Sequence, residues 1–272
     1  MKNKPYFFVI PIILLGTLGS CICYTKTSQT GLSLMGAAGT ILIAAYVYLE
    51  LYDYQQRLQE LLHLQEASIG ALVELAQMRD EEVTGRHLNR LPFYAQVLAE
   101  DLGLNPEFKE NIVKTIALHD IGKVAVPDSI LKKPGPLNRE EWIRIRRHPL
   151  AGAAVLDAIS EELDGSNRQV AEYLATAQEI ALNHHEKWDG SGYPQGLEGR
   201  AIPLSARVAA VCDVYDSLRS TRPYKRGFSH EEAVEIIRSG RGTHFDPRLI
   251  DSFERLAGRF EAIWEKHGEQ TR

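Results

Sequence analysis

Hydrophobic and polar positions divide the chain into an apolar N-terminal part and a longer amphipathic part. Residues 5–25 and 27–49 carry no charge, and one lysine separates them. Each run reaches the roughly 20 residues that a helix needs to cross a bilayer, and aromatic residues stand near the ends. Two lysines precede the first run, which by the positive-inside rule places the N-terminus in the cytoplasm. We therefore expect a two-helix transmembrane hairpin over residues 1–50, with the rest of the chain cytoplasmic.

A cleaved signal peptide is the rival interpretation of the first apolar run. The sequence Leu18-Gly19-Ser20-Cys21 resembles a lipoprotein cleavage site. Cleavage there would leave one span and an anchored N-terminus outside the cell. The length of the first run and the second span directly after it favour the hairpin.

Residues 51–78 have apolar positions at spacings of three, four and seven, which predicts one amphipathic helix. These positions are Leu51, Tyr54, Leu58, Leu61, Leu62, Ile69, Leu72 and Leu75. We expect a helical stalk that merges into the first helix of the following domain. Its first half is typical of a parallel coiled coil and predicts a homodimer. The alternative is that the segment is only the first helix of the globular domain.

Residues 65–260 show helical patterning almost throughout, and strand-length runs of alternating valines are absent. Asn105 and Asn138 stand where helices should start, and Ser229 with Glu232 has the spacing of a capping box. Glycine and proline mark loops between these patterns. The pattern predicts an all-α helical bundle over 65–260, followed by a C-terminal tail at 261–272.

Composition narrows the range of partners. The 272 residues carry a net charge of −5, so the chain lacks the broad basic surface that DNA or RNA binding requires. The three cysteines include no CxxC zinc spacing and no disulfide framework, which fits a reducing compartment. An anionic substrate would have to be met by local cations or by metal ions.

The histidines fall into two sets. His63, His230, His244 and His267 stand in stalk, cap, loop and tail settings, where surface or capping roles are expected. The remaining five histidines stand near helix ends or beside aspartates, together with two further acidic candidates. This second set comprises His87, His119, Asp120, His148, His184, His185 and Asp213.

Adjacent His119 and Asp120 indicate metal chemistry, because a carboxylate can bridge two cations while an imidazole binds one of them. Two-metal centres of this kind lower the pKa of bound water for in-line attack. Side chains of His184 and His185 diverge by about 100° on a helix, so both could reach one polynuclear centre but not one chelating face. The glycine-rich loop that ends at Pro194 can shape a substrate entrance. A simple helix C-terminus is the alternative for this pair.

Several motifs occur in a fixed order. They are His-Asp-Ile-Gly-Lys at 119–123, Arg-His-Pro at 147–149, His-His-Glu-Lys-Trp-Asp-Gly-Ser-Gly-Tyr-Pro at 184–194, Asp-Val-Tyr-Asp-Ser-Leu at 213–218, Arg-Pro-Tyr-Lys at 222–225 and Gly-Thr-His-Phe-Asp-Pro at 242–247. Over about residues 65–255 the chain resembles HD-GYP domains, the cyclic di-GMP phosphodiesterase branch of the HD metal-dependent phosphohydrolase superfamily. The resemblance implies a bacterial inner-membrane location for the predicted hairpin.

The resemblance also implies roles for individual residues. It assigns metal ligation to His87, His119, Asp120, His148, His184, His185 and Asp213. Lys123 would lie near the scissile phosphate and share the catalytic work with Asp120. Arg222 and Lys225 would hold the phosphate and guanine ends of the substrate, with ordinary surface solvation as the alternative.

One departure bears on the number of metal ions. Family members with three metals carry a glutamate four residues before the first histidine, and here that position is Val83. Glu81 and Glu82 are off the helical register of His87. We therefore expect two divalent ions, with iron or manganese suited to these ligands and other divalent ions left open.

The implied reaction is hydrolysis of cyclic di-GMP to pGpG, or onward to GMP, by a metal-bridging hydroxide. Two alternatives remain open. The first is an HD hydrolase that acts on another cyclic dinucleotide or on a mononucleotide. The second is a non-catalytic module that binds the nucleotide and signals.

Overall fold

The structure is a computed structural model that describes residues 29–77, 86–162, 168–221 and 226–267. It divides into two compact units, residues 1–68 and 69–272. Val83, Arg222 and Lys225 lie outside the described residues, so the predictions that rest on them stay predictions.

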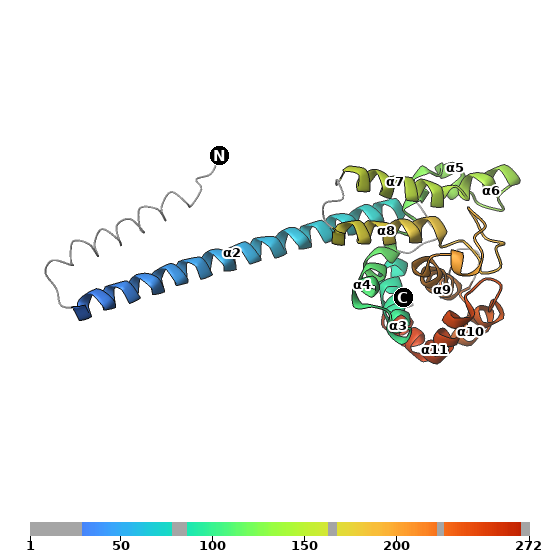
Figure 1. The fold of residues 1–272 in the computed structure, drawn as a ribbon. Coiled ribbons are helices and arrows are strands. Elements are labelled where there is room, and N and C mark those ends of the chain that lie inside the picture. The colour runs from blue at the N-terminus through green and yellow to red at the C-terminus, as the bar shows by residue number, and fades with distance from the viewer. Residues whose placement is uncertain (1–28, 78–85, 163–167, 222–225, 268–272) are drawn as a thin grey trace. The chain divides into compact units, whose positions relative to one another are not determined.

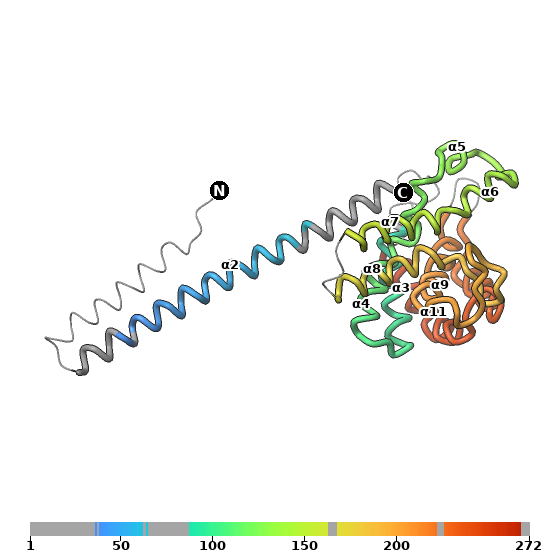
Figure 2. The backbone as a smooth tube through the Cα atoms, turned by 45° about the horizontal axis from the view of Figure 1, so that its top comes forward, coloured from blue at the N-terminus to red at the C-terminus, as the bar shows by residue number. Residues whose placement is uncertain are grey.

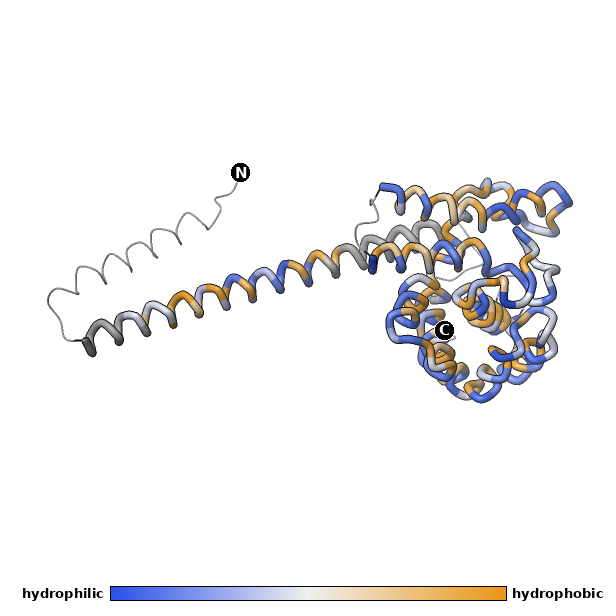
Figure 3. The backbone as a smooth tube through the Cα atoms, in the orientation of Figure 1, coloured by the Kyte–Doolittle hydropathy of each residue, from blue (hydrophilic) through white to orange (hydrophobic). Residues whose placement is uncertain are grey.

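The first unit contains most of α2, a single helix over Gln29–Gln77. Apolar and polar residues are interspersed along the coloured part of this helix (Figure 3). Leu51, Tyr54, Leu58 and Leu61 are all exposed. The predicted stalk segment is therefore helical where it is described, and no described residue covers these four side chains.

The predicted transmembrane hairpin and multi-pass membrane location are contradicted. Among the described residues, no helix is long and apolar enough to cross a membrane. The first predicted span, and with it the alternative signal peptide, lies outside the described residues.

The second unit is helical, as predicted, and its described residues contain no strand beyond isolated bridges. Its helices (Figure 1) are α3 (Arg86–Asp101), α4 (Pro106–Thr115), α5 (Asp128–Leu131), α6 (Arg139–Ile145), α7 (His148–Glu162), α8 (Arg168–Asn183), α9 (Leu204–Arg219), α10 (His230–Ser239) and α11 (Pro247–His267). Three 3₁₀ helices join them, namely η1 (Ile116–Leu118), η2 (Ile121–Ala125) and η3 (Gly199–Ala201).

The predicted helix caps form. The side chain of Asn105 accepts hydrogen bonds from the first backbone N–H groups of α4. Asn138 with Glu141, and Ser229 with Glu232, form complete capping boxes at α6 and α10. Each cap satisfies backbone donors that have no partner within the helix, so these helices begin at defined residues.

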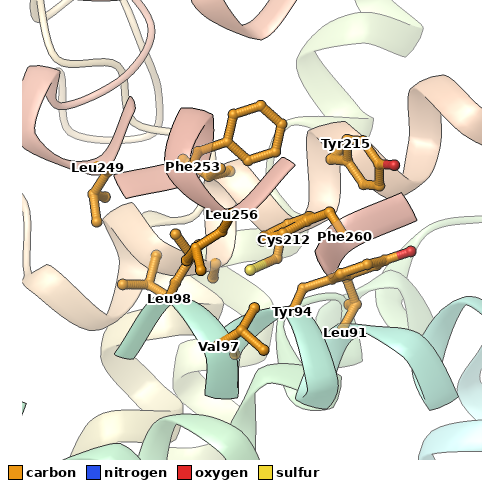
Figure 4. Close-up of a cluster of buried hydrophobic side chains, with 14 of the residues drawn as sticks. Leu91, Tyr94, Val97, Leu98, Cys212, Tyr215, Leu249, Phe253, Leu256 and Phe260 are labelled. Atoms are coloured by element: carbon orange, nitrogen blue, oxygen red, sulfur yellow. The ribbon is translucent and has the colours of Figure 1, made fainter. Parts of the chain in front are cut away.

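The main core lies between α3, α9 and α11, as Figure 4 shows. Tyr94 of α3 stacks on Phe260 of α11 at 4.7 Å between ring centroids, and Tyr215 of α9 meets both rings edge to face. A smaller apolar cluster joins α3, η1, α7 and α8. The helices α7 and α8 run side by side in two views (Figures 1 and 2). Together the two clusters fix the elements that carry the histidines.

Candidate metal centre

The structure brings together all seven residues that the sequence proposed as ligands. They come from α3, the junction of η1 and η2, the start of α7, the end of α8, and α9. Their ligand atoms form two groups, and within each group these atoms lie within 4.8 Å of one another. The first group is Asp120, His148, His184 and His185, and the second group is His87, His119 and Asp213.

Three of these histidines direct Nε2 into the centre. Nδ1 of His119 donates to the carbonyl of Ile116 at 2.9 Å, and Nδ1 of His148 donates to that of Ile145 at 2.7 Å. Nδ1 of His184 likewise faces backbone carbonyls of its own helix. These contacts fix the tautomer and leave Nε2 with its lone pair facing inward.

The inward-facing atoms have no hydrogen-bond partner among the described residues. They are Nε2 of His119, His148 and His184, and Oδ1 of Asp120. Buried polar atoms without partners are rare in folded proteins and need an explanation such as an ion. Divalent cations held by the two groups would supply the missing interactions of these four atoms, so the residues fit metal ions.

Asp120 lies between the two groups. Its Oδ1 is 3.2 Å from Nε2 of His148 and 3.7 Å from Nε2 of His184. Its Oδ2 is 3.2 Å from Nε2 of His119. Each oxygen of this carboxylate thus faces a different group, which is the arrangement of a bridging ligand.

The pKa values of the centre depend on burial and on the charges around Asp120. Burial disfavours the ionised carboxylate, but Lys123 and His119 outweigh it and hold the pKa of Asp120 well below its usual range. Burial lowers the pKa of both His184 and His185, which keeps these imidazoles neutral as metal ligation requires. Burial also opposes a charge on His119, but Asp120 outweighs it and raises the pKa of His119 to about 9. A cation would replace that proton.

Lys123 lies at the same centre. Its Nζ is 2.8 Å from Oδ2 of Asp120, and its side chain is 16% exposed. The lysine can therefore reach both the bridging carboxylate and solvent. It is placed where an anionic group that enters the centre would meet it.

Sequence reasoning assigned no role to Asp216 and Arg90, which support His87 on the side away from the centre. Nδ1 of His87 donates to Oδ2 of the buried Asp216 at 2.6 Å. The fully buried Arg90 also binds Asp216, through Nε at 2.6 Å and Nη2 at 2.8 Å. The guanidinium of Arg90 stacks over Trp264 at 4.3 Å. The spacing offered a signal, because Asp216 lies three residues after the candidate ligand Asp213, on the same helix face.

Glu186 was also missed, and it organises the glycine-rich loop. Its buried carboxylate accepts backbone N–H bonds from Gln195 at 2.7 Å, from Gly196 at 3.2 Å and from Leu197 at 3.1 Å. A Cβ at Gly192 would lie 2.5 Å from Cα of Glu186, so only glycine fits there. The loop is thereby folded back onto the centre.

The four histidines that were expected in surface or capping roles lie outside both groups where they are described. His230 contacts Tyr215, His244 stacks on Phe245, and His267 stacks on Phe93. The side chain of His63 is not among those described. No described member of this set joins the seven candidate ligands.

The fold and site define an all-α domain with a buried histidine–aspartate centre able to hold divalent metal ions. The chain belongs to the HD domain family, whose family model matches residues 70–249. Membership of the HD superfamily, predicted from the motifs, is thus confirmed.

Curated relatives agree with this assignment. A probable cyclic di-GMP phosphodiesterase of Vibrio cholerae is 47% identical over 238 residues, which is 85% of this chain and 53% of that protein. A cyclic di-GMP phosphodiesterase of Thermotoga maritima is 37% identical, over 72% of this chain and 50% of that protein. A 3′3′-cGAMP-specific phosphodiesterase 2 of Vibrio cholerae is 38% identical, over 75% of this chain and 38% of that protein. The chain therefore spans about half or less of the length of these relatives.

A solved structure shares the fold. The crystal structure of a cyclic GMP-AMP specific phosphodiesterase of Vibrio cholerae (V-cGAP3) matches with a TM-score of 0.52 at 19% identity. The match covers 71% of this chain and 50% of that chain. At this identity the likeness establishes the fold alone.

Proposed function

We propose that this chain is a metal-dependent phosphodiesterase that hydrolyses cyclic di-GMP to pGpG. The position of Asp120 carries the proposal, because its two oxygens face two separate groups of ligands. The names of several relatives support the choice of substrate. The motifs at 119–123 and 184–194 support the same choice.

Two divalent ions, when bound, would supply an activated water and neutralise charge on the phosphoryl oxygens. Asp120 would bridge the pair, the first group would hold one ion, and the second group would hold the other. Val83 in place of a family glutamate supports a count of two. Nitrogen and carboxylate donors suit iron or manganese.

Lys123 would act on the substrate directly. Its Nζ lies 2.8 Å from Asp120 Oδ2, so its charge is available where the scissile phosphate would approach. There it can donate to a phosphoryl oxygen or to the leaving 3′-oxygen, which stabilises charge that grows during cleavage. Arg222 and Lys225 would bind the phosphate and guanine ends.

A second candidate substrate is 3′3′-cGAMP, because one relative at 38% identity is named as specific for it. The two dinucleotides differ in one base, so the same centre could serve either. The choice between them depends on base contacts at the substrate entrance, and turnover measurements with both nucleotides distinguish them.

The α2 helix would join two copies of the chain. Four of its apolar side chains are 45–66% exposed at the spacings of a coiled coil, namely Leu51, Tyr54, Leu58 and Leu61. A second α2 would cover them. Light scattering should report a dimer for the full chain and a monomer for Leu58→Glu.

The test of the activity uses the full chain, purified without oxygen and loaded with Mn²⁺ or Fe²⁺. Cyclic di-GMP should be converted to pGpG, identified by chromatography, and Asp120→Ala should abolish turnover. Unchanged activity in Asp120→Ala would refute the assigned role. Binding of the nucleotide without turnover would identify a non-catalytic module, and three tightly held ions per chain would contradict the two-metal site.

A further inference from the structure

A pocket of about 590 Å³ lies on the short helix α6, outside the seven ligands. Arg139, Trp142, Ile143 and Arg146 line it. Trp142 and Ile143 are each 50% exposed. A tryptophan with half of its surface in water, next to arginines, is a common feature of binding surfaces.

The pocket is connected to the metal centre by a series of stacked groups. The ring of Tyr193 lies 4.7 Å from that of His185, a member of the first group. The guanidinium of Arg146 lies 4.9 Å from the Tyr193 ring and 5.7 Å from the Trp142 ring. The end of α6 also adjoins the centre, because the carbonyl of Ile145 holds Nδ1 of His148 at 2.7 Å.

The chemistry of the lining matches a nucleobase with a nearby phosphate. Bases stack on aromatic rings and on guanidinium planes, and arginine can bind the O6 and N7 atoms of guanine. Arg139 and Arg146 are exposed, and neither forms an ion pair with any residue that the structure describes. In a chain with net charge −5, this pair of cations marks a local site for an anion.

We propose that this pocket is a purine subsite of the phosphodiesterase. One base of the cyclic dinucleotide stacks on Trp142, and Arg146 places a positive charge between that base and the metal centre. The inference rests on the proposed function, and it names contacts that the seven ligands and Lys123 do not provide. It also assigns α6 a part in selecting the substrate.

A protein partner is the other reading of exposed apolar side chains on α6. Leu150 and Val155 on α7 are exposed too, at 50% and 40%. The pocket differs from these residues because arginines line it and because stacking connects it to His185. Those two features favour a nucleotide.

The test compares two substrates on the full, Mn²⁺-loaded chain. Cyclic di-GMP requires the subsite, whereas bis(p-nitrophenyl) phosphate requires only the metal centre. Trp142→Ala should lower kcat/KM for cyclic di-GMP, relative to the aryl diester, about 10-fold through a higher KM. Trp142→Phe keeps an aromatic face and should stay within about 3-fold of wild type.

Arginine variants on the same helix provide a matched pair. Arg146→Gln should also raise the KM for cyclic di-GMP, because it removes the charge between the base and the centre. Arg144→Gln removes an equal charge from an exposed residue of α6 that does not line the pocket, and it should leave both activities unchanged. Equal effects of the two variants would reduce the role of Arg146 to general electrostatics and overturn its assignment.

Other outcomes separate this proposal from the proposed function. An unchanged KM in a folded Trp142→Ala protein overturns the subsite, and a change in oligomeric state without a change in KM identifies a protein interface. If the wild-type chain cleaves no cyclic di-GMP, the proposed function fails, and calorimetric binding of cyclic di-GMP decides on the subsite. Weaker binding to Trp142→Ala by about 10-fold then supports it, and equal or absent binding overturns it.

Discussion

His87 donates a hydrogen bond from Nδ1 to Oδ2 of Asp216 over 2.6 Å, and both side chains are buried. Because Nδ1 carries the proton, Nε2 of His87 is left to face Asp213, whose Oδ1 is 3.5 Å away. Burial disfavours the charged form of Asp216, but hydrogen bonds from Arg90 and His87 outweigh it and lower its pKa. Asp216 is therefore an ionised acceptor that fixes the orientation of a candidate ligand without entering the centre.

Replacement of this acceptor should weaken metal binding. In Asp216→Asn the amide is a poorer acceptor, so His87 loses the bond that fixes its tautomer. We expect metal affinity to fall by about 10- to 100-fold, measured by chelator competition with Mn²⁺. Asp251→Asn, which removes a carboxylate from an exposed ion pair with Arg241, serves as control and should bind metal as wild type. Wild-type affinity in a folded Asp216→Asn chain would contradict the positioning role.

Replacement of Arg90 should affect the unfolding free energy more than the affinity for metal. Both Arg90 and Asp216 have fully buried side chains, so Arg90→Met leaves an uncompensated buried charge. We expect a loss of about 3–5 kcal/mol in the free energy of unfolding, measured by urea denaturation of metal-free protein. In the double variant Arg90→Met with Asp216→Asn the loss should be smaller than the sum.

The matched control for Arg90 is an exposed ion pair. Arg241 pairs with Asp251 while both side chains are about half exposed, at 45% and 49%. Arg241→Met should therefore destabilise the chain much less than Arg90→Met. Equal losses for Arg90→Met and Arg241→Met would show that burial of the first pair has no special weight.

Six of the seven candidate ligands could be proposed from the sequence because they stand in short motifs, and only His87 lies outside these motifs. Helix caps such as Asn138 with Glu141 were also predictable, because they depend on residues three positions apart. The contact between Arg90 and Asp216 joins residues 126 positions apart, and no local pattern encodes it. Glu186 stood inside a recognised motif, but its three backbone partners appear only when the loop folds back.

The transmembrane prediction failed for a different reason. It depended on a count of uncharged residues over 27–49, and such a count gives glycine, serine and threonine the same weight as leucine. The structure instead describes one long helix, α2, that continues past Leu49 into the charged residues Glu50 and Asp53. Because α2 does not end where the apolar run ends, the run alone did not give the bounds of a helix.

A close approach of two backbones should make Gly122 irreplaceable. A Cβ at this position would lie 1.9 Å from the carbonyl oxygen of His148 and 2.3 Å from the backbone nitrogen of Gly152. In Gly122→Ala, η2 must move away from α7, and Asp120 directly precedes η2. We expect a loss of about 1–3 kcal/mol in unfolding free energy and weaker metal binding.

Gly258→Ala is the control for Gly122→Ala. Gly258 lies inside α11, and a Cβ there would meet nothing within 4 Å. Because alanine has the higher helix propensity, Gly258→Ala should stabilise the chain by up to about 1 kcal/mol. A Gly122→Ala protein as stable as wild type would show that η2 and α7 can separate without loss.

His244 should make the domain sensitive to acid. Burial lowers the pKa of His244 to about 4, and the charge of Lys187 pushes it in the same direction, while Asp189 and Asp213 oppose the shift. The unfolded chain binds this proton near pH 6.5, well before the folded chain does. The contribution of neutral His244 to the unfolding free energy is therefore complete above about pH 6.5 and is lost as the pH falls toward about 4.

Protonation of His244 should lower the unfolding free energy by up to about 2 kcal/mol at pH 4.5. Each pKa unit corresponds to about 1.4 kcal/mol, and the contact of the side chain with water reduces the total. Urea unfolding of the wild type and of His244→Gln, from pH 7.5 to 4.5 with a chelator present, isolates this contribution from metal release. The glutamine variant carries no titratable group at this position, so its stability should fall less steeply with acid. Parallel pH profiles for the two proteins would show that the imidazole takes up its proton equally well in the folded and unfolded states, and would contradict the effect of burial.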